Sequence, residues 1–139
     1  MLDSNFSEIV YESLWSLTNI AGGNNNYASS IVIKGGIPKI INLIDSQIME
    51  IQEQAVWCLG NLASESIHIR DKIIALKGLD KIVSLLAKTD RNSLIKNIVW
   101  AITSFCRPDP PMPYDIVKPV FSFFYILKKF YYDYYYYVK

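Results

Sequence analysis

Three tryptophans at almost equal spacing constrain this chain more than any other feature of its 139 residues. Trp57 lies 42 residues after Trp15, and Trp100 lies 43 residues after Trp57. Each tryptophan is followed, four residues later, by a small polar residue, and these residues are Asn19, Asn61 and Ser104. Residues four apart lie on one face of an α-helix, one turn above the other. The interval therefore predicts an array of stacked helical repeats.

The helices expected between these markers follow one order. Residues 1–22 are predicted to form a long helix, with Asn5 and Glu8 at capping-box spacing near its start. Its apolar stripe is expected to be formed by Ile9, Leu14, Leu17 and Ile20. A short, a medium and a long helix follow over residues 27–34, about 37–45 and 49–63. The medium helix holds Pro38 in its first turn, where the missing N–H has little effect.

This triplet of helices is then predicted to recur. A short helix is expected over residues 67–76, a medium helix over 78–86 and a long helix over 90–106. Residues 78–86 align with residues 36–44 at a shift of 42, and their apolar positions coincide. A partial medium helix is expected over residues 117–127, after a cluster of prolines ends the long helix.

The period places the fold in a recognised class. Repeats of about 40–47 residues are typical of armadillo and HEAT arrays. We therefore expect an all-α, right-handed superhelical solenoid of about two and a half to three armadillo repeats over residues 1–130. The units are expected at 1–22 (partial), 27–64, 67–106 and 114–130 (partial). Residues 131–139 are rich in tyrosine and are expected to leave the repeat pattern.

Composition excludes several classes of function. A net charge of +1 argues against broad electrostatic binding to nucleic acid or to anionic membranes. The apolar run at 120–127 is shorter than the roughly 20 residues that a transmembrane helix needs. Cys58 and Cys106 have no cysteine or histidine partners at metal-binding spacing, so both are expected to be buried thiols. The only histidine, His68, is expected on the surface, and no catalytic residue, metal or cofactor is predicted.

The tryptophan–asparagine pairs predict a peptide-binding groove. Side by side, the pairs Trp15–Asn19 and Trp57–Asn61 would form a row of indoles and a row of carboxamides. The carboxamides can bond a peptide backbone, and the indole faces can hold the methylene stems of Lys or Arg, with a cation–π contribution of about 0.5–2 kcal/mol each. The alternative is that the tryptophans belong to the core. Other apolar residues of the long helices already supply a core face, which favours the groove.

The strings WSLTNIAGG, GGIPKIINLI and EIQEQAVWCLGNLA, with Arg70-Asp71, resemble the importin-α family over residues 6–120. The register resembles the second, the third and the start of the fourth armadillo repeats, which form the major groove for Lys/Arg-rich nuclear localisation signals. The resemblance implies tryptophan slots at Trp15, Trp57 and Trp100, and asparagine clamps at Asn19 and Asn61. It also implies groove positions at Gly23, Gln54, Glu65, Asn97 and Ser104.

Two positions depart from the family pattern. Ser104 replaces the third clamping asparagine. Glu65 stands where the family usually has an aspartate that binds the central lysine, whereas the carbonyl of Gly23 is expected to help hold that lysine.

The resemblance implies a non-enzymatic receptor for basic import signals, located in cytoplasm and nucleus. Cargo proteins with such signals are the partners expected. Importin-β is expected only if another segment supplies its binding site, since these residues contain no counterpart of it. The residues leave two alternatives open. The first is a generic armadillo scaffold for another partner, and the second is a truncated product without import activity.

Overall fold

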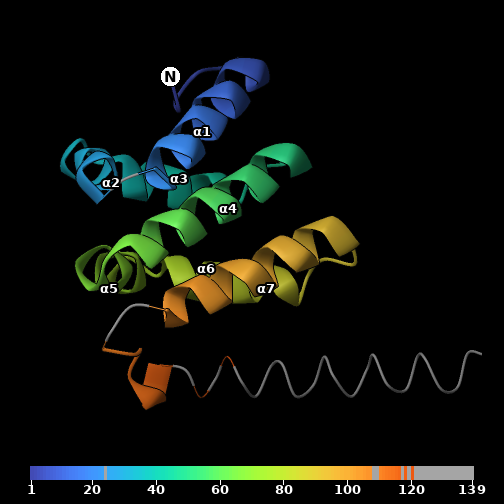
Figure 1. Cartoon of the computed structure of the whole chain (residues 1–139). Helices are drawn as coiled ribbons and strands as arrows, with labels where there is room; N and C mark the ends of the chain where they lie inside the picture. The colour runs from blue at the N-terminus through green and yellow to red at the C-terminus, as the bar shows by residue number, and fades with distance from the viewer. Residues whose placement is uncertain (24, 108–109, 117, 119, 121–139) are drawn as a thin grey trace, which may run out of the picture.

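The computed structural model describes residues 1–23, 25–107, 110–116, 118 and 120, and the regular elements within these ranges are all helices (Figure 1). The prediction of an all-α armadillo array is confirmed. The seven helices are α1 (Ser7–Ala21), α2 (Asn25–Ile33), α3 (Gly36–Leu43), α4 (Met49–Glu65), α5 (Ile67–Ala75), α6 (Gly78–Leu86) and α7 (Asn92–Cys106). The partial helix predicted over residues 117–127 and the tail at 131–139 lie outside the described residues, apart from Lys118 and Val120.

The three long helices form one layer. α1, α4 and α7 lie side by side, and α4 packs against both of its long neighbours (Figure 1). The shorter helices α3 and α6 lie behind this layer in the same view, and each is joined through a short connection to the long helix that follows it. Two shorter helices followed by a long one recur as the sequence spacing predicted. The predicted difference between a short and a medium helix was wrong, because α2 and α5 have 9 residues each, whereas α3 has 8 and α6 has 9.

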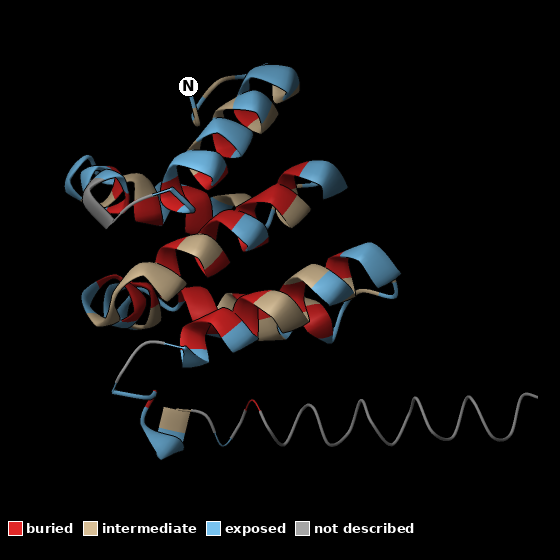
Figure 2. Ribbon diagram, in the orientation of Figure 1, coloured by how far each residue is buried: buried red, intermediate tan, exposed pale blue. Residues whose placement is uncertain are grey.

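The core lies where the helices face one another (Figure 2). In α3 the buried residues are Ile37, Ile40 and Ile41, and in α6 they include Leu79 and Ile82, the counterparts of Ile37 and Ile40 at a shift of 42. Burial of one such side chain stabilises the fold by about 1.5–3 kcal/mol. The aligned apolar positions thus build the same layer twice.

The turns before α3 and before α6 share the same backbone geometry as well. Gly35 has φ +71° and Lys77, 42 residues later, has φ 63°. Glycine adopts this left-handed conformation at little energetic cost, whereas a residue with a Cβ is strained there by about 1–2 kcal/mol. The second unit therefore keeps the turn even though its sequence no longer favours it.

The predicted start of the first helix was wrong. α1 begins at Ser7, with Phe6 as its N-cap and no side-chain cap bond, so Asn5 and Glu8 do not form a capping box. The hydroxyl of Ser4 instead accepts the backbone N–H of Phe6 at 3.1 Å. A local side-chain bond of this kind holds the chain in a turn and delays the helix.

α7 also begins later than predicted, at Asn92 instead of residue 90. The hydroxyl of Thr89 accepts the backbone N–H of Arg91 at 3.2 Å. This bond again forms a turn just before the helix.

Two predictions about burial were also wrong. Cys58 is buried as expected, but Cys106 is exposed, because it lies in the last turn of α7. The core face of α1 is formed by Val10, Leu14, Thr18 and Ala21, whereas Ile9 and Ile20 are each 42% exposed. The spacing of apolar residues misplaced the stripe because a second apolar face is present on this helix.

Candidate peptide-binding surface

Three residues at four-residue intervals form a column on α4. Trp57 is 45% exposed, and Asn61 and Glu65 are half-buried. Each interval corresponds to about 6 Å along the helix axis, so the column spans about 12 Å. An exposed indole, an amide and a carboxylate therefore follow one another over a length that suits the side chain and backbone of a bound peptide.

The amide of Asn61 is held by the neighbouring long helix. Its Nδ2 donates to the carbonyl oxygen of Thr18 in α1 at 2.9 Å. The same carbonyl accepts the backbone N–H of Gly22 at 3.1 Å. A Cβ on Gly22 would lie 3.2 Å from Nδ2, so the absence of a side chain there gives the amide its room. This one bond uses one of the two N–H groups of the amide and fixes its orientation.

Gln54 lies behind the column rather than on it. The side chain is 5% exposed, and its Nε2 donates to the hydroxyl of Thr18 at 2.8 Å. That hydroxyl donates in turn to the carbonyl of Leu14 at 2.8 Å. This chain of bonds connects α4 to α1. A contact between Gln54 and peptide remains a prediction that its burial does not support.

The equivalent pair on α1 is the most open of the three. Trp15 is 52% exposed, and the exposed side chain of Asn19 has no hydrogen-bond partner within the described residues. Gly23 is exposed just beyond the end of α1, and its N–H donates to the carbonyl of Ile20 at 3.3 Å. Both tryptophans of the intact pairs thus lie on the surface, as the groove interpretation predicted.

The third unit, on α7, differs in its polar residue. Trp100 is half-buried and meets Trp57 edge-on, with ring centroids 6.3 Å apart and an interplanar angle of 74°. Ser104 is fully buried, and its hydroxyl donates to the carbonyl of Trp100 at 3.0 Å. Asn97, one turn before Trp100, is half-buried. The indole therefore continues the row of α1 and α4, while the buried hydroxyl of Ser104 does not reach the surface.

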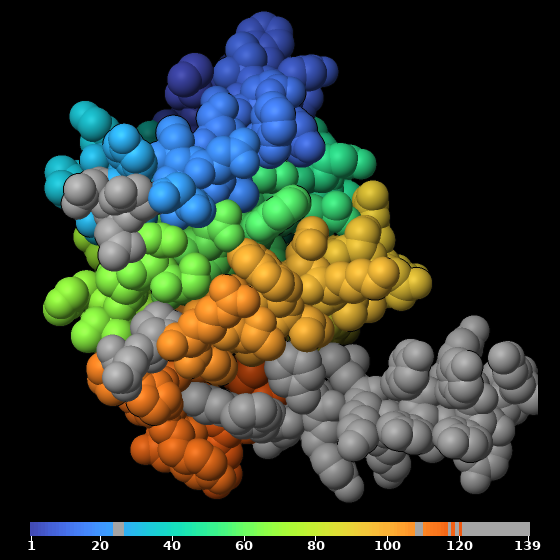
Figure 3. Space-filling model, viewed as in Figure 1, coloured from blue at the N-terminus to red at the C-terminus, as the bar shows by residue number. Residues whose placement is uncertain are grey.

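The close contact of α4 with α7 depends on Gly60. A Cβ at this residue would lie 2.6 Å from Cζ3 of Trp100 and 3.0 Å from Cα of Ala101. A Cβ atom essentially never lies within 3.0 Å of a non-bonded heavy atom, so a side chain at residue 60 would force the Trp100 ring to move away from α4. The surfaces of α1, α4 and α7 follow one another down the same face of the molecule (Figure 3).

The electrostatics at one end of this surface favour a cation. The last turns of α1 and α4 hold no basic residue. The dipole of each helix places a partial negative charge at these ends. Glu65 is the last residue of α4, and its carboxylate has no ion-pair partner among the residues that the structure describes. The carboxylate and the helix ends together would attract a Lys or Arg side chain.

A second carboxylate belongs to the same column and was not predicted. Glu53 lies one turn before Trp57, and its side chain is 19% exposed. The carboxylate lies 3.2 Å from Nε of Arg91 and accepts the hydroxyl of Ser93 at 2.6 Å. The four-residue spacing from Trp57 places Glu53 on the same face of α4, and the sequence could have shown this. The sequence carries no signal for the pairing of Glu53 with residues at the start of α7. Arg91 neutralises this end of the column.

Other types of site find no support in the described part of the chain. No three His, Cys, Asp or Glu side chains come close enough there to hold a metal ion. None of the helices found there has both the length and the apolar character needed to cross a membrane. His68 is exposed, as predicted.

One family model and two curated proteins illustrate what this chain is similar to. The family model described as "Armadillo/beta-catenin-like repeat" matches residues 24–64. Importin subunit alpha-4 of Arabidopsis thaliana is 41% identical over 81% of this chain and 21% of its own length. Importin subunit alpha-2 of the same plant is 34% identical over 82% of this chain and 21% of its own length. This chain therefore spans about a fifth of the length of these curated relatives.

A solved structure extends the similarity to the fold. A designed armadillo repeat protein in complex with the peptide (KR)4 superposes with a TM-score of 0.74 and 30% sequence identity. The match covers 78% of this chain and 45% of the designed protein.

Proposed function

Since this chain is an armadillo-repeat chain similar in sequence to importin subunits alpha, we propose that it binds Lys/Arg-rich peptides of the nuclear localisation type. The column of Trp57, Asn61 and Glu65 carries this proposal. The Trp57 face holds the aliphatic stem of a basic side chain, the Asn61 amide bonds the peptide backbone, and the Glu65 carboxylate pairs with a cation. The function is non-enzymatic recognition.

Two further observations support a basic ligand. The last turns of α1 and α4 hold no basic residue, and the helix dipole gives both ends a partial negative charge, which favours a cation at this place. The designed armadillo protein with the same fold is in complex with a peptide of alternating Lys and Arg. A chain that carries such peptides acts as an adaptor in nuclear import and is present in both cytoplasm and nucleus. Its partners are cargo proteins, and importin-β only where another segment supplies that contact.

Titration of a fluorescent Lys/Arg heptapeptide into the full chain at low salt tests the proposal. We expect saturable binding that weakens as salt rises, because exposed charges are screened. An Asp/Glu heptapeptide is the matched control and should not bind. Glu65→Gln keeps the size of the side chain and removes its charge, so it should weaken binding about threefold to tenfold. A folded protein that binds neither peptide, or both equally, contradicts the proposal.

One observation favours a second candidate, a general armadillo scaffold. Ser104 is buried at the position where the other units carry an amide, and the carboxylate of Glu53 is paired with Arg91. An acidic ligand would be repelled less beside this pair than beside the carboxylate of Glu65, which is unpaired within the described residues, and an apolar ligand would displace fewer solvated charges. A peptide array separates the two, because a preference for acidic or apolar peptides would favour the scaffold.

A further inference from the structure

The column on α4 has a carboxylate at each of its two ends. Glu53 lies one turn before Trp57, and Glu65 lies two turns after it. The twelve-residue interval between the two glutamates corresponds to about 18 Å along the helix axis. A peptide that follows the row of tryptophans from α1 to α7 crosses α4 between these carboxylates. Each glutamate therefore marks one edge of the path of the peptide.

An extended peptide presents its side chains to both edges of this path. Successive side chains of an extended chain point to opposite sides of the backbone. A peptide whose backbone is bonded by Asn61 would thus direct alternate side chains towards Glu65 and towards Glu53. Glu65 has no ion-pair partner within the described residues and can take a cation directly. What the other edge accepts depends on the state of Glu53.

The carboxylate of Glu53 is already occupied by a cation of the chain itself. Nε of Arg91 lies 3.2 Å from Oε1 of Glu53, and a terminal nitrogen of the same guanidinium lies 3.9 Å from Oε1 of Glu50. The hydroxyl of Ser93 donates to Oε1 of Glu53 at 2.6 Å and accepts from Nε of Arg91 at 3.0 Å. A guanidinium is the group that an arginine of the peptide would bring. Arg91 therefore stands where a basic side chain of the peptide would bind.

The contact between α1 and α4 is built without such a pair. Arg91 is the N-cap of α7, nine residues before Trp100, and Ile48 is the N-cap of α4, nine residues before Trp57. The residue four before Trp15 on α1 is Tyr11, where α4 has Glu53. The first two long helices thus pack side by side with uncharged residues at both positions. The pairing of Arg91 with Glu53 is not a requirement of the helical stack.

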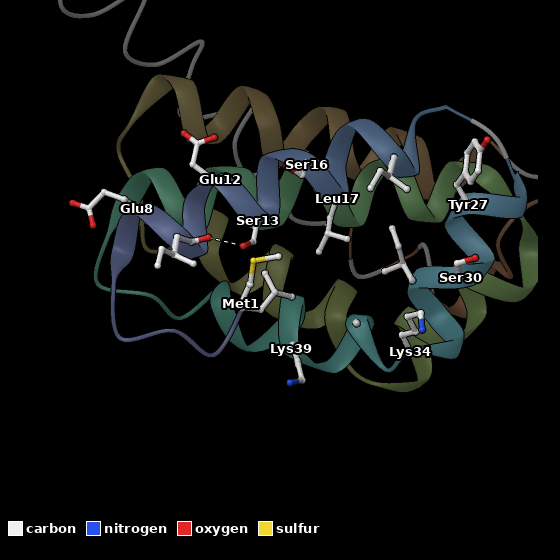
Figure 4. A pocket seen from close by; sticks show the side chains of 15 residues that line it. Met1, Glu8, Glu12, Ser13, Ser16, Leu17, Tyr27, Ser30, Lys34 and Lys39 are labelled. Atoms are coloured by element: carbon white, nitrogen blue, oxygen red, sulfur yellow. Dashed lines mark hydrogen bonds between the residues drawn. The ribbon is translucent and has the colours of Figure 1, made fainter.

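The counterpart of Glu50 on α1 has no cation beside it either. This residue is Glu8, which lies at one end of a separate cleft between α1 and the helices α2 and α3, with its carboxylate pointing away from the cleft (Figure 4). Its Oε2 accepts the hydroxyl of Ser7 at 3.2 Å, and it forms no ion pair within the part of the chain that the structure describes. A cation held over these positions is a feature of the contact between α4 and α7.

We propose that Arg91 acts as a built-in competitor that closes the Glu53 edge of the groove to basic side chains of the peptide. Arg91 would act on the proposed binding of Lys/Arg-rich peptides, on which this inference rests. The chain then selects cations that point towards Glu65, whereas side chains that point towards Glu53 need not be basic. The side chains of Arg91 and Glu53 are 39% and 19% exposed. Partly exposed pairs contribute little to stability, so this one can be opened without loss of the fold.

Removal of the guanidinium tests the proposal, because it frees the carboxylate of Glu53. We expect the Lys/Arg heptapeptide to bind Arg91→Gln about threefold to tenfold more tightly than the unchanged chain. Fluorescence anisotropy at about 0.15 M salt, where distant exposed charges are screened, measures the change. Arg91→Met keeps the length of the side chain and should show the same gain, so the test survives if one of the two variants is unfolded. Circular dichroism melting verifies that the variants are folded.

Two controls separate this effect from a general change in charge. Lys88→Gln also removes one positive charge, three residues before Arg91, where Lys88 is exposed and forms no ion pair within the described ranges. It should change binding less than about twofold. In a double-variant cycle, Glu53→Gln should abolish the gain of Arg91→Gln, whereas Glu65→Gln should weaken binding and leave that gain in place.

A second peptide tests the rule of specificity. A heptapeptide with Lys at every second position and Ser between them directs its cations to one edge only. It should therefore gain less than about twofold from Arg91→Gln, while the heptapeptide with Lys or Arg at every position gains about threefold to tenfold.

Three results would overturn the proposal and leave the proposed function in place. The first is unchanged affinity of the basic heptapeptide for both neutral variants of Arg91. The second is an equal gain from Lys88→Gln, and the third is a gain from Arg91→Gln that persists in the presence of Glu53→Gln. If neither the folded unchanged chain nor the folded variants bind the basic heptapeptide, the proposed function is wrong, and the role of Arg91 is wrong with it.

Discussion

The Trp–Asn unit of α4 and the Trp–Ser unit of α7 occupy the same turns of equivalent helices, yet their polar residues behave differently. Asn61 reaches the carbonyl of Thr18 on the neighbouring helix, whereas the hydroxyl of Ser104 bonds to Trp100 on its own helix. The amide of Asn61 keeps one N–H group for a further bond, and the hydroxyl of Ser104 is fully buried.

This difference shows that the position of the indole does not determine the position of the polar group. Both helices place their tryptophans in the same row, and Trp57 meets Trp100 at 6.3 Å. The side chain four residues later must be long enough to cross to the next helix if it is to be oriented at the surface. Asparagine is long enough and serine is not. The hydrogen bonding of a peptide backbone by these polar side chains is therefore expected to weaken from α4 to α7.

The largest expected difference between the two helices concerns their cysteines. Cys58, next to Trp57, is buried, and burial raises the pKa of its thiol to about 12. The hydrogen bond with Thr18 lowers this pKa, but by less than burial raises it. Partial burial raises the pKa of Cys106 as well, although the charge of Arg70 opposes this. At pH 8 we expect a thiol reagent to label Cys106 at least about 100-fold faster than Cys58, because the thiolate is the reactive form.

The pKa of Cys58 also has a consequence for stability. Its folded value of about 12 lies above the ordinary thiol value, so the folded state holds the proton more tightly. The protonated thiol of Cys58 therefore contributes its full share of folding stability below about pH 8.5, and this share is lost as the pH rises through about 12. A Cys106→Ser variant isolates Cys58, whose labelling should then require denaturant. Equal labelling of both thiols in the folded protein would contradict the packing described for α4.

The contact between the two helices can be broken at Gly60. Gly60→Ala places a Cβ 2.6 Å from the Trp100 ring, which must then move. We expect the free energy of unfolding to fall by about 1–3 kcal/mol, less what alanine gains as a helix former. Chemical denaturation followed by tryptophan fluorescence measures the change.

Gly23→Ala is the matched control. Apart from its two neighbours in the chain, the nearest atom to its new Cβ would lie 3.5 Å away, an ordinary van der Waals distance. It should change stability by less than about 0.5 kcal/mol. If both variants lose the same stability, close packing of Trp100 on Gly60 is not what holds α7 against α4.

Peptide binding should separate the two polar residues directly. Asn61→Ala removes the oriented amide and is expected to weaken binding of the Lys/Arg heptapeptide about tenfold, the equivalent of one or two hydrogen bonds. Ser104→Ala removes a hydroxyl that bonds within its own helix, and should change binding less than about twofold. Fluorescence anisotropy measures both. Equal effects would show that the two units contribute alike.

The sequence alone predicted most of the fold, because the signals that define it are local. The period of the tryptophans located the long helices, and glycine and proline located the turns between them. The exposure of Trp15 and Trp57 followed from the same pattern, because other residues of each helix already formed a core face. These inferences needed only the spacing within a helix.

The features that were missed all depend on contacts between helices. Gln54 is buried because the hydroxyl of Thr18 meets it from α1. Glu53 is neutralised because Arg91 reaches it from the start of α7. The open stripe on α1 could not be told from a core face, since Ile9 and Ile20 have the residue type and spacing of buried positions. No pattern within one helix contains this information.

The central claim is that basic peptides bind along the row of tryptophans and that binding centres on Trp57 and Asn61. The chain has three indole N–H groups, each of which gives one resonance in a proton–nitrogen NMR spectrum. A Trp57→Phe variant assigns the Trp57 signal. Titration with the Lys/Arg heptapeptide should shift this signal most, saturably and with the same Kd as anisotropy, while the Asp/Glu heptapeptide shifts none. Saturable binding that leaves the Trp57 indole signal unmoved would contradict the account.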